Sequence, residues 1–253
     1  SVMGYDARKA TDEELTKMKV MLREAMENGS LGLSTGLIYP PGCYADIDEI
    51  VELCKIVSEF DGIYATHMSN ESNYVTEAVK QAIEIGWRAN VRVEISHHKI
   101  CGKSNWGKSS ETLKLVNDAI EAGQKITIDQ YPYNANMTHL NVCIPPKYFD
   151  HGIQGMTEWL NDTNNRSKII EEMTDVNGGY DNFYINCGGW NNVYISYLPN
   201  TPEYVGMFVS EYAKEVNKEP FNAYFDLLIQ NNGEGAGIFF SMNEDDIINI
   251  FKN

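Results

Sequence analysis

Basic residues, long apolar runs and closely spaced cysteines are all scarce in this sequence. Only 20 lysines and arginines stand against 36 acidic residues, which gives a formal net charge of −16 at pH 7. Nucleic-acid phosphates and anionic lipids attract clusters of lysine and arginine, so we expect neither nucleic acid nor a membrane as a partner. No run of about 18 apolar residues could span a bilayer, and residues 1–10 lack the pattern of a secretory signal. These absences predict a soluble, cytoplasmic protein.

The cysteines also lack the pattern of a disulfide framework. There are five of them, an odd number, and no two form a Cys-x-x-Cys pair. Scattered single cysteines are typical of reduced thiols. The remaining composition, with 43% hydrophobic and 11% aromatic residues in a chain of 253, is sufficient for a large buried core. We therefore expect a globular protein whose core does not depend on disulfides.

The first half of the sequence contains a regular alternation of helices and strands. Apolar residues at helical spacing alternate with short apolar runs, and glycines such as Gly29, Gly86 and Gly123 end several of the helices. The expected helices begin near residues 11, 46, 74 and 110, and the strands that follow them are 31–35, 63–66, 91–96 and 126–128. Parallel strands need a crossover connection, which a helix supplies. The pattern therefore predicts an α/β fold with a parallel sheet.

The regular pattern divides the chain into three expected parts. Residues 1–133 carry the βα units described above, whereas residues 134–182 are irregular and contain one expected helix, at 159–174. We interpret 134–182 as an inserted subdomain. Strands at 193–197 and 237–242, with helices between and after them, then predict that residues 183–253 are later βα units of the same sheet.

Two histidines occupy equivalent places in consecutive βα units. His67 follows the strand at 63–66 and His97 follows the strand at 91–96, thirty residues later. In a (β/α)8 barrel the carboxyl ends of the strands form the active-site face, and adjacent strands lie about 5 Å apart. Two such imidazoles can therefore share one cation. A single histidine at a strand end would be a structural cap as readily as a ligand, but the pair favours metal binding.

Three other side chains are expected near these histidines. In Ser96-His97-His98-Lys99, period-2 alternation sends His97 and Lys99 to one face and His98 to the other, against the surrounding helices. Lys99 could then bind a substrate carboxylate or polarise a carbonyl. Tyr131 follows the strand at 126–128 and could donate to a developing oxyanion, and Tyr39 is a weaker candidate for substrate contact. A solvated surface lysine and ordinary structural tyrosines are the alternatives.

One motif favours a different function. Residues 102–109, GKSNWGKS, match the phosphate-binding pattern GxxxxGK[ST] between a strand and a helix. Several residues separate this motif from the preceding strand, however, and the bulky Trp106 stands where the backbone would have to wrap phosphates. Nucleotide binding through Gly102 to Ser109 is therefore the alternative hypothesis.

Taken together, five motifs resemble one known family in their order and spacing. These are Gly32-Leu33-Ser34-Thr35-Gly36-Leu37-Ile38-Tyr39, Tyr64-Ala65-Thr66-His67-Met68 with Glu71, Ile95-Ser96-His97-His98-Lys99, Asn105-Trp106-Gly107-Lys108-Ser109 and Asp129-Gln130-Tyr131-Pro132-Tyr133. The family is that of the N-acyl-D-amino-acid deacylases, or D-aminoacylases, of the amidohydrolase superfamily. The set is far more specific than any one motif, and it covers residues 31–133 best.

The resemblance implies a fold, an activity and a site. It implies a (β/α)8 TIM barrel in which one or two Zn²⁺ ions activate a water that hydrolyses the amide bond of an N-acyl-D-amino acid. His67 and His97 match the zinc histidines on the family's strands. Lys99, Tyr131 and Tyr39 match positions that line its substrate pocket, with Lys99 and Tyr131 as the catalytic candidates.

Some of the family's features do not occur in this sequence. The family has a His-x-His strand, a cysteine ligand and a late aspartate that acts as general base, and none of these is recognisable here. The chain therefore resembles an internal segment that lacks the first and last barrel strands. An incomplete barrel has open sheet edges, which favour self-association, and two histidines alone make a poor zinc site. We expect weak activity or none from the segment alone, and a catalytically dead remnant that binds a partner is a further alternative.

Overall fold

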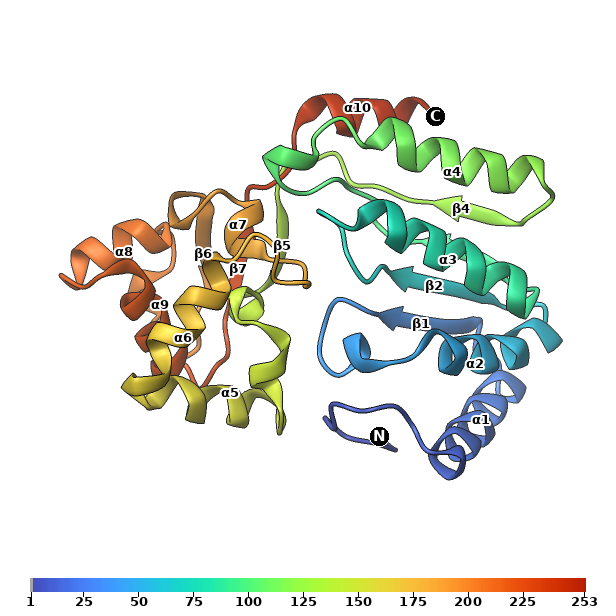
Figure 1. The fold of residues 1–253 in the computed structure, drawn as a ribbon, viewed down its shortest axis with the longest axis horizontal. Coiled ribbons are helices and arrows are strands. Elements are labelled where there is room, and N and C mark those ends of the chain that lie inside the picture. The colour runs from blue at the N-terminus through green and yellow to red at the C-terminus, as the bar shows by residue number, and fades with distance from the viewer. Residues whose placement is uncertain (1) are drawn as a thin grey trace. The chain divides into compact units, whose positions relative to one another are not determined.

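A computed structural model describes residues 2–253 and divides them into two compact units (Figure 1). The first unit contains the chain up to Ile100, Gly107–Pro132 and Asp245–Asn253. The second contains Cys101–Trp106 and Tyr133–Glu244. These boundaries differ from the three expected parts, because residues 133–244 form one unit and the last helix belongs to the first.

The first unit is built on a four-stranded parallel sheet with the strand order β1-β2-β3-β4. Its strands are β1 (Gly32–Gly36), β2 (Ile63–His67), β3 (Arg92–Ile95) and β4 (Ile126–Ile128). Neighbouring strands are in parallel register, with Gly36 opposite His67 and Thr66 opposite Ile95. The strands end at nearly the same level, so the residues that follow them are gathered at one edge of the sheet.

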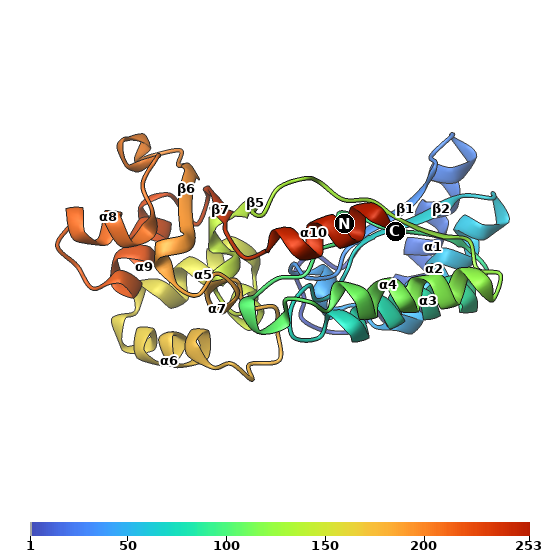
Figure 2. The same ribbon diagram turned by 90° about the horizontal axis from the view of Figure 1, so that it is seen from above.

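Helical crossovers connect these strands, as the alternation of the sequence predicted. The helices are α1 (Asp12–Glu27), α2 (Ile47–Glu59), α3 (Val75–Ala89) and α4 (Ser109–Glu121). The prediction that Gly86 ends its helix is wrong, because α3 continues to Ala89 and is capped by Asn90 in a left-handed conformation. Seen from above, α3 and α4 cover one face of the sheet (Figure 2), and α2 packs against both α3 and the first two strands. The α/β class with a parallel sheet is therefore confirmed for this unit.

The core of the first unit lies between the sheet and these helices. Val79 and Ile85 of α3 are buried against Tyr64, Val93 and Ile126 of the strands. Burying such side chains stabilises the fold by about 1.5–3 kcal/mol each relative to exposure. This packing holds β2 and β3 side by side, which determines where His67 and His97 lie.

The second unit contains a small antiparallel sheet with the strand order β5-β7-β6. Its strands are β5 (Asn136–His139), β6 (Val193–Tyr197) and β7 (Ala236–Phe239), and β7 pairs antiparallel with both neighbours. The prediction that 193–197 and 237–242 are parallel strands of the first sheet is therefore wrong. Two helices that pack on each other, α8 (Val209–Glu215) and α9 (Pro220–Gln230), connect β6 to β7. The connection therefore contains two helices rather than the single crossover helix of a parallel βαβ unit.

The irregular stretch at 134–182 contains two helices where the sequence predicted one. They are α5 (Gly152–Asn161) and α6 (Thr163–Thr174), and a short helix, α7 (Phe183–Asn186), follows them. The chain turns at Asp162, whose backbone is extended and whose side chain accepts a hydrogen bond from Asn164 N. Asp162 is therefore an N-cap, and it starts a new helix inside the expected one. Among the described residues, no helix combines the length and the apolar character needed to cross a bilayer.

The N-terminus of α4 is occupied by a carboxylate of the same unit. The last helix, α10 (Glu244–Lys252), brings Asp246 to this point, where its two carboxylate oxygens accept hydrogen bonds from Gly107 N at 2.8 Å and Ser109 N at 3.3 Å. A phosphate loop would offer these amides to a nucleotide. Since a buried aspartate takes them, the nucleotide-binding hypothesis is not supported.

Replacing Asp246 is expected to destabilise the first unit. Asp246→Ala leaves two backbone amides without their acceptor, and the free energy of unfolding should fall by about 1–2 kcal/mol. Asp245→Ala is the matched control, because Asp245 is exposed and one residue away. Urea denaturation of the two variants and the wild type measures the difference. Equal stability of both variants would show that the capping interaction is unimportant.

Candidate metal centre

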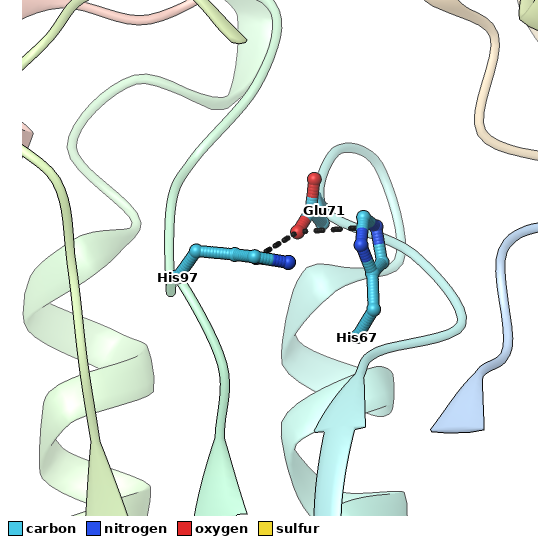
Figure 3. Close-up of side chains that lie close together, drawn as sticks. All are labelled: His67, Glu71 and His97. Atoms are coloured by element: carbon cyan, nitrogen blue, oxygen red, sulfur yellow. Dashed lines mark ion pairs between the residues drawn. The ribbon is translucent and has the colours of Figure 1, made fainter. Parts of the chain in front are cut away.

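Three potential metal ligands meet beyond the carboxyl ends of β2 and β3. One ligand atom from each of His67, Glu71 and His97 lies within 4.8 Å of the others. The two imidazole rings have centroids 4.4 Å apart and meet edge to face, at 72°. Figure 3 shows the His67 and His97 side chains converging, with the Glu71 carboxylate beside both rings. The expectation that the two histidines lie side by side is confirmed.

His67 is the last residue of β2 and is largely enclosed. Its side chain is 15% exposed, and its carbonyl accepts a hydrogen bond from Leu37 N at 3.0 Å, which ties the strand end to the chain that follows β1. Burial lowers the pKa of His67 to about 4. The ring is therefore neutral at neutral pH, and its buried Nε2 makes no hydrogen bond. A neutral imidazole is the form that binds a metal ion.

His97 lies two residues beyond the end of β3, in a left-handed backbone conformation. Its φ is 42°, which is uncommon for a residue with a side chain. The Asp129 carboxylate accepts the His97 backbone N–H, and the Asp129 carbonyl accepts His98 N at 2.8 Å. His97 and Lys99 face the site and His98 faces away from it, as predicted. The cause is a turn held by Asp129 and not the alternation of a strand.

Glu71 was present in the motifs but was given no role by the sequence analysis. Its side chain is 1% exposed, and its Oε1 lies 3.4 Å from Nε2 of His67 and 3.5 Å from Nδ1 of His97. Burial raises the pKa of Glu71, but its interactions with His67, Lys99 and His97 outweigh burial and lower the pKa below its usual range. The four-residue spacing from His67 was the only available signal, and such a spacing is common in any chain.

Lys99 is a buried partner of this carboxylate and is not a solvated surface lysine. Its side chain is 3% exposed, and its Nζ lies 2.5 Å from Glu71 Oε1 and 2.7 Å from His97 Nδ1. An ammonium has three donor hydrogens, and Glu71 Oε1 accepts one of them. The structure therefore places Lys99 at the site, as predicted.

The two tyrosines named from the sequence also border the site. The Tyr39 ring lies 5.0 Å from the His67 ring, and the Tyr131 ring lies 6.4 Å from the His97 ring. The Lys99 ammonium lies 5.5 Å from the centroid of the Tyr131 ring. All five residues named as ligands or substrate contacts are thus brought together within the first unit.

His98 points away from the site, as the sequence analysis predicted. It is 1% exposed, and its Nε2 lies 2.8 Å from Thr112 Oγ1 of α4. Burial, followed by the charge of Lys99, lowers the pKa of His98 to about 4. His98 therefore packs as a neutral polar group between the sheet edge and α4.

The donor set fits a zinc ion better than the sequence suggested. Two histidines alone are too few ligands for a closed zinc site, but the structure adds a buried carboxylate beside them, and a carboxylate at the second nitrogen of a zinc-bound histidine is a usual supporting group. The low pKa of the His67 ring points in the same direction, because a neutral imidazole can bind a metal ion. A metal ion at this place would be held by His67 and His97.

Acid should destabilise the protein through His98. The pKa of His98 in the folded state is lowered from 6.5 to about 4, because the folded protein disfavours the protonated ring. The stability of the fold is therefore unaffected by His98 above pH 6.5 and decreases as the pH falls from there towards 4. One such group accounts for at most about 3 kcal/mol. In His98→Gln, the free energy of unfolding should fall less between neutral pH and pH of about 5 than in the wild type. Urea denaturation at both pH values measures this, and identical losses would contradict it.

The chain is similar to several known proteins over part of their length. No family model matches the chain. A D-aminoacylase of Alcaligenes xylosoxydans xylosoxydans is 45% identical over 140 residues, which are 55% of this chain and 29% of that protein. A solved D-aminoacylase, described with a binuclear metal centre, has 29% identity and a TM-score of 0.72 over 97% of this chain and 42% of its own.

A third relative is a deacylase of another substrate. The N-acyl-D-glutamate deacylase of Bordetella bronchiseptica, solved with zinc and a phosphonate inhibitor, has 25% identity and a TM-score of 0.74 over 98% of this chain and 43% of its own. The chain therefore spans less than half of the length of each of these relatives. The resemblance to the N-acyl-D-amino-acid deacylases, which the five sequence motifs indicated, is confirmed over this part of their length.

Proposed function

We propose that this chain carries part of the active site of a zinc-dependent amidohydrolase that cleaves the amide bond of N-acyl-D-amino acids. The observation that carries the proposal is the pair of imidazoles at the carboxyl ends of adjacent parallel strands, with ring centroids 4.4 Å apart. Solved structures with a similar fold include a deacylase with zinc and an aminoacylase with a binuclear metal centre. One or two zinc ions are therefore the expected cofactor.

A metal ion bound by His67 and His97 would supply a water of lowered pKa and polarise the amide carbonyl. The residues of the chain prepare this chemistry. Burial keeps His67 neutral and ready to bind, and the Asp129 carboxylate holds the backbone turn from which His97 projects. Tyr39 and Tyr131 border the histidines on two sides, where a phenol can donate to a developing oxyanion.

Lys99 is proposed to bind the carboxylate of the substrate. Its ammonium is already oriented by Glu71, and a further donor hydrogen is available to a ligand. An acylated amino acid has a carboxylate next to its amide bond. Binding this carboxylate at Lys99 would bring the amide towards the two histidines, because Lys99 lies beside His97.

We also propose that the four-stranded sheet is part of a (β/α)8 barrel. Its strands are parallel and sequential, helices cover one face, and the candidate site lies at the carboxyl ends of the strands. In such barrels the active site lies at this end. The outer edges of β1 and β4 would then pair with further strands.

Metal content tests the proposed cofactor. Elemental analysis of the chain after exposure to zinc should find about one ion bound at the two histidines, and His67→Ala and His97→Ala should each lose it. His139→Ala is the control, because His139 belongs to the second unit. Zinc retained in both site variants would contradict the proposed ligands.

Turnover of N-acyl-D-amino acids by the isolated chain is expected to be weak or absent, and zinc-dependent hydrolysis assays measure it.

Ligand binding tests the role of Lys99. Calorimetry should show tighter binding of an N-acetyl-D-amino acid than of its carboxamide analogue, and Lys99→Met should abolish the difference. The expected loss is about tenfold or more, because a hydrogen bond to a charged group contributes about 1.5–3 kcal/mol. Lys80→Met, at an exposed position of α3, is the control. Unchanged discrimination in Lys99→Met would assign the carboxylate to another residue.

A further inference from the structure

We propose that Glu71 is a positioning residue that orients both histidines and Lys99 through a single carboxylate oxygen. Oε1 lies 2.5 Å from Lys99 Nζ, 3.4 Å from His67 Nε2 and 3.5 Å from His97 Nδ1. Side chains from the ends of two strands therefore meet at one buried atom. The inference rests on the proposed function, because it assigns His67 and His97 as the metal ligands.

The turn between β2 and α3 holds Glu71 rigidly. Asn70, which is 5% exposed, accepts hydrogen bonds at its Oδ1 from Ser72 N and Tyr74 N, both at 2.9 Å. These bonds fold the backbone on both sides of Glu71 into a tight turn. Ser69 donates to Gln81 Oε1 of α3 at 2.8 Å and anchors the start of the turn. The carboxylate consequently enters the site from a fixed backbone.

Each imidazole presents a different nitrogen to Glu71. His67 does so with Nε2 and His97 with Nδ1, which leaves Nδ1 of His67 and Nε2 of His97 for a metal ion. Figure 3 shows the nitrogen at the end of the His97 side chain pointing towards the His67 ring, while the carboxylate lies beside both rings. A carboxylate at the second nitrogen of a ligating histidine fixes the tautomer and the ring orientation.

Glu71 is better placed for this role than as a ligand. Its Oε1 already accepts a hydrogen bond from the Lys99 ammonium, and both side chains are almost completely buried. A second cation bound to the same oxygen would be repelled by this ammonium in a poorly solvated place. With Lys99 as its counter-ion, Glu71 introduces no net charge into the site.

The first test requires no metal. Proton–nitrogen correlation spectra of the histidine rings, recorded at one neutral pH, report the tautomer and the hydrogen bonding of each ring nitrogen. In Glu71→Gln, the ring signals of His67 and His97 should both change, whereas those of His139 and His151 in the second unit should not. Glu77→Gln removes the same charge at an exposed position of α3 and should change none. Unchanged His67 and His97 signals in Glu71→Gln would overturn the inference, whether or not the chain binds zinc.

The second test separates positioning from direct ligation. Zinc affinity should fall by about tenfold to a hundredfold in Glu71→Gln, while Co²⁺ bound at saturation should keep the visible absorption bands of the wild type. Altered Co²⁺ bands would show that Glu71 is itself a ligand and would overturn the positioning role. A wild-type chain that binds no metal would contradict the proposed function, and the ring spectra would still decide the inference.

A double substitution avoids the unpaired buried charge that Glu71→Gln leaves. Glu71→Gln alone leaves the buried Lys99 ammonium without its counter-ion, which is strongly destabilising. Glu71→Gln with Lys99→Met removes both charges and keeps the volumes similar. In this variant the ring signals of His67 should still differ from those of the wild type, because the orienting carboxylate is absent. An unchanged His67 ring in the double variant would overturn the inference.

Discussion

The parallel pairing of β2 with β3 is the constraint on which the candidate site depends. Thr66 lies opposite Ile95 in this ladder, so the chain leaves the two strands at the same level and on the same side of the sheet. His67 and His97 follow from these points, and their rings meet although thirty residues separate them. A shift of the register by one residue would turn the side chains of one strand to the opposite face and would separate the ligands.

Two carboxylates from outside β2 and β3, those of Asp129 and Glu71, support this geometry. Asp129, just beyond β4, accepts the backbone N–H of His97 and supports its left-handed conformation. Glu71, in the turn before α3, lies against both rings and the Lys99 ammonium. The site is therefore supported from β4 on one side and from the β2–α3 turn on the other. Such support keeps ligating side chains in place before a metal ion or substrate arrives.

The low pKa of His67 connects this architecture to the proposed chemistry. Burial disfavours the protonated ring, and a neutral ring is what a metal ion requires. Burial would also make the charged Glu71 carboxylate unfavourable on its own. The Lys99 ammonium, 2.5 Å from Glu71, compensates the negative charge. The buried part of the site can therefore contain the Glu71 carboxylate, the Lys99 ammonium and the neutral imidazole of His67. Relatives with zinc or a binuclear metal centre share the fold around this arrangement.

The sequence by itself determined the α/β alternation of the first unit and the residues that gather at its site. Hydrophobic periodicity and glycine stops are local signals, and the end of a parallel strand is a predictable position, so His67, His97, Lys99, Tyr39 and Tyr131 could be named in advance. Only the tertiary structure decided that Glu71 is central, because its role arises from contacts with residues of another βα unit. It also decided that β6 and β7 are antiparallel and that Asp246 occupies the N-terminus of α4. Strand direction and long-range capping depend on how helices pack, and local patterns do not encode that packing.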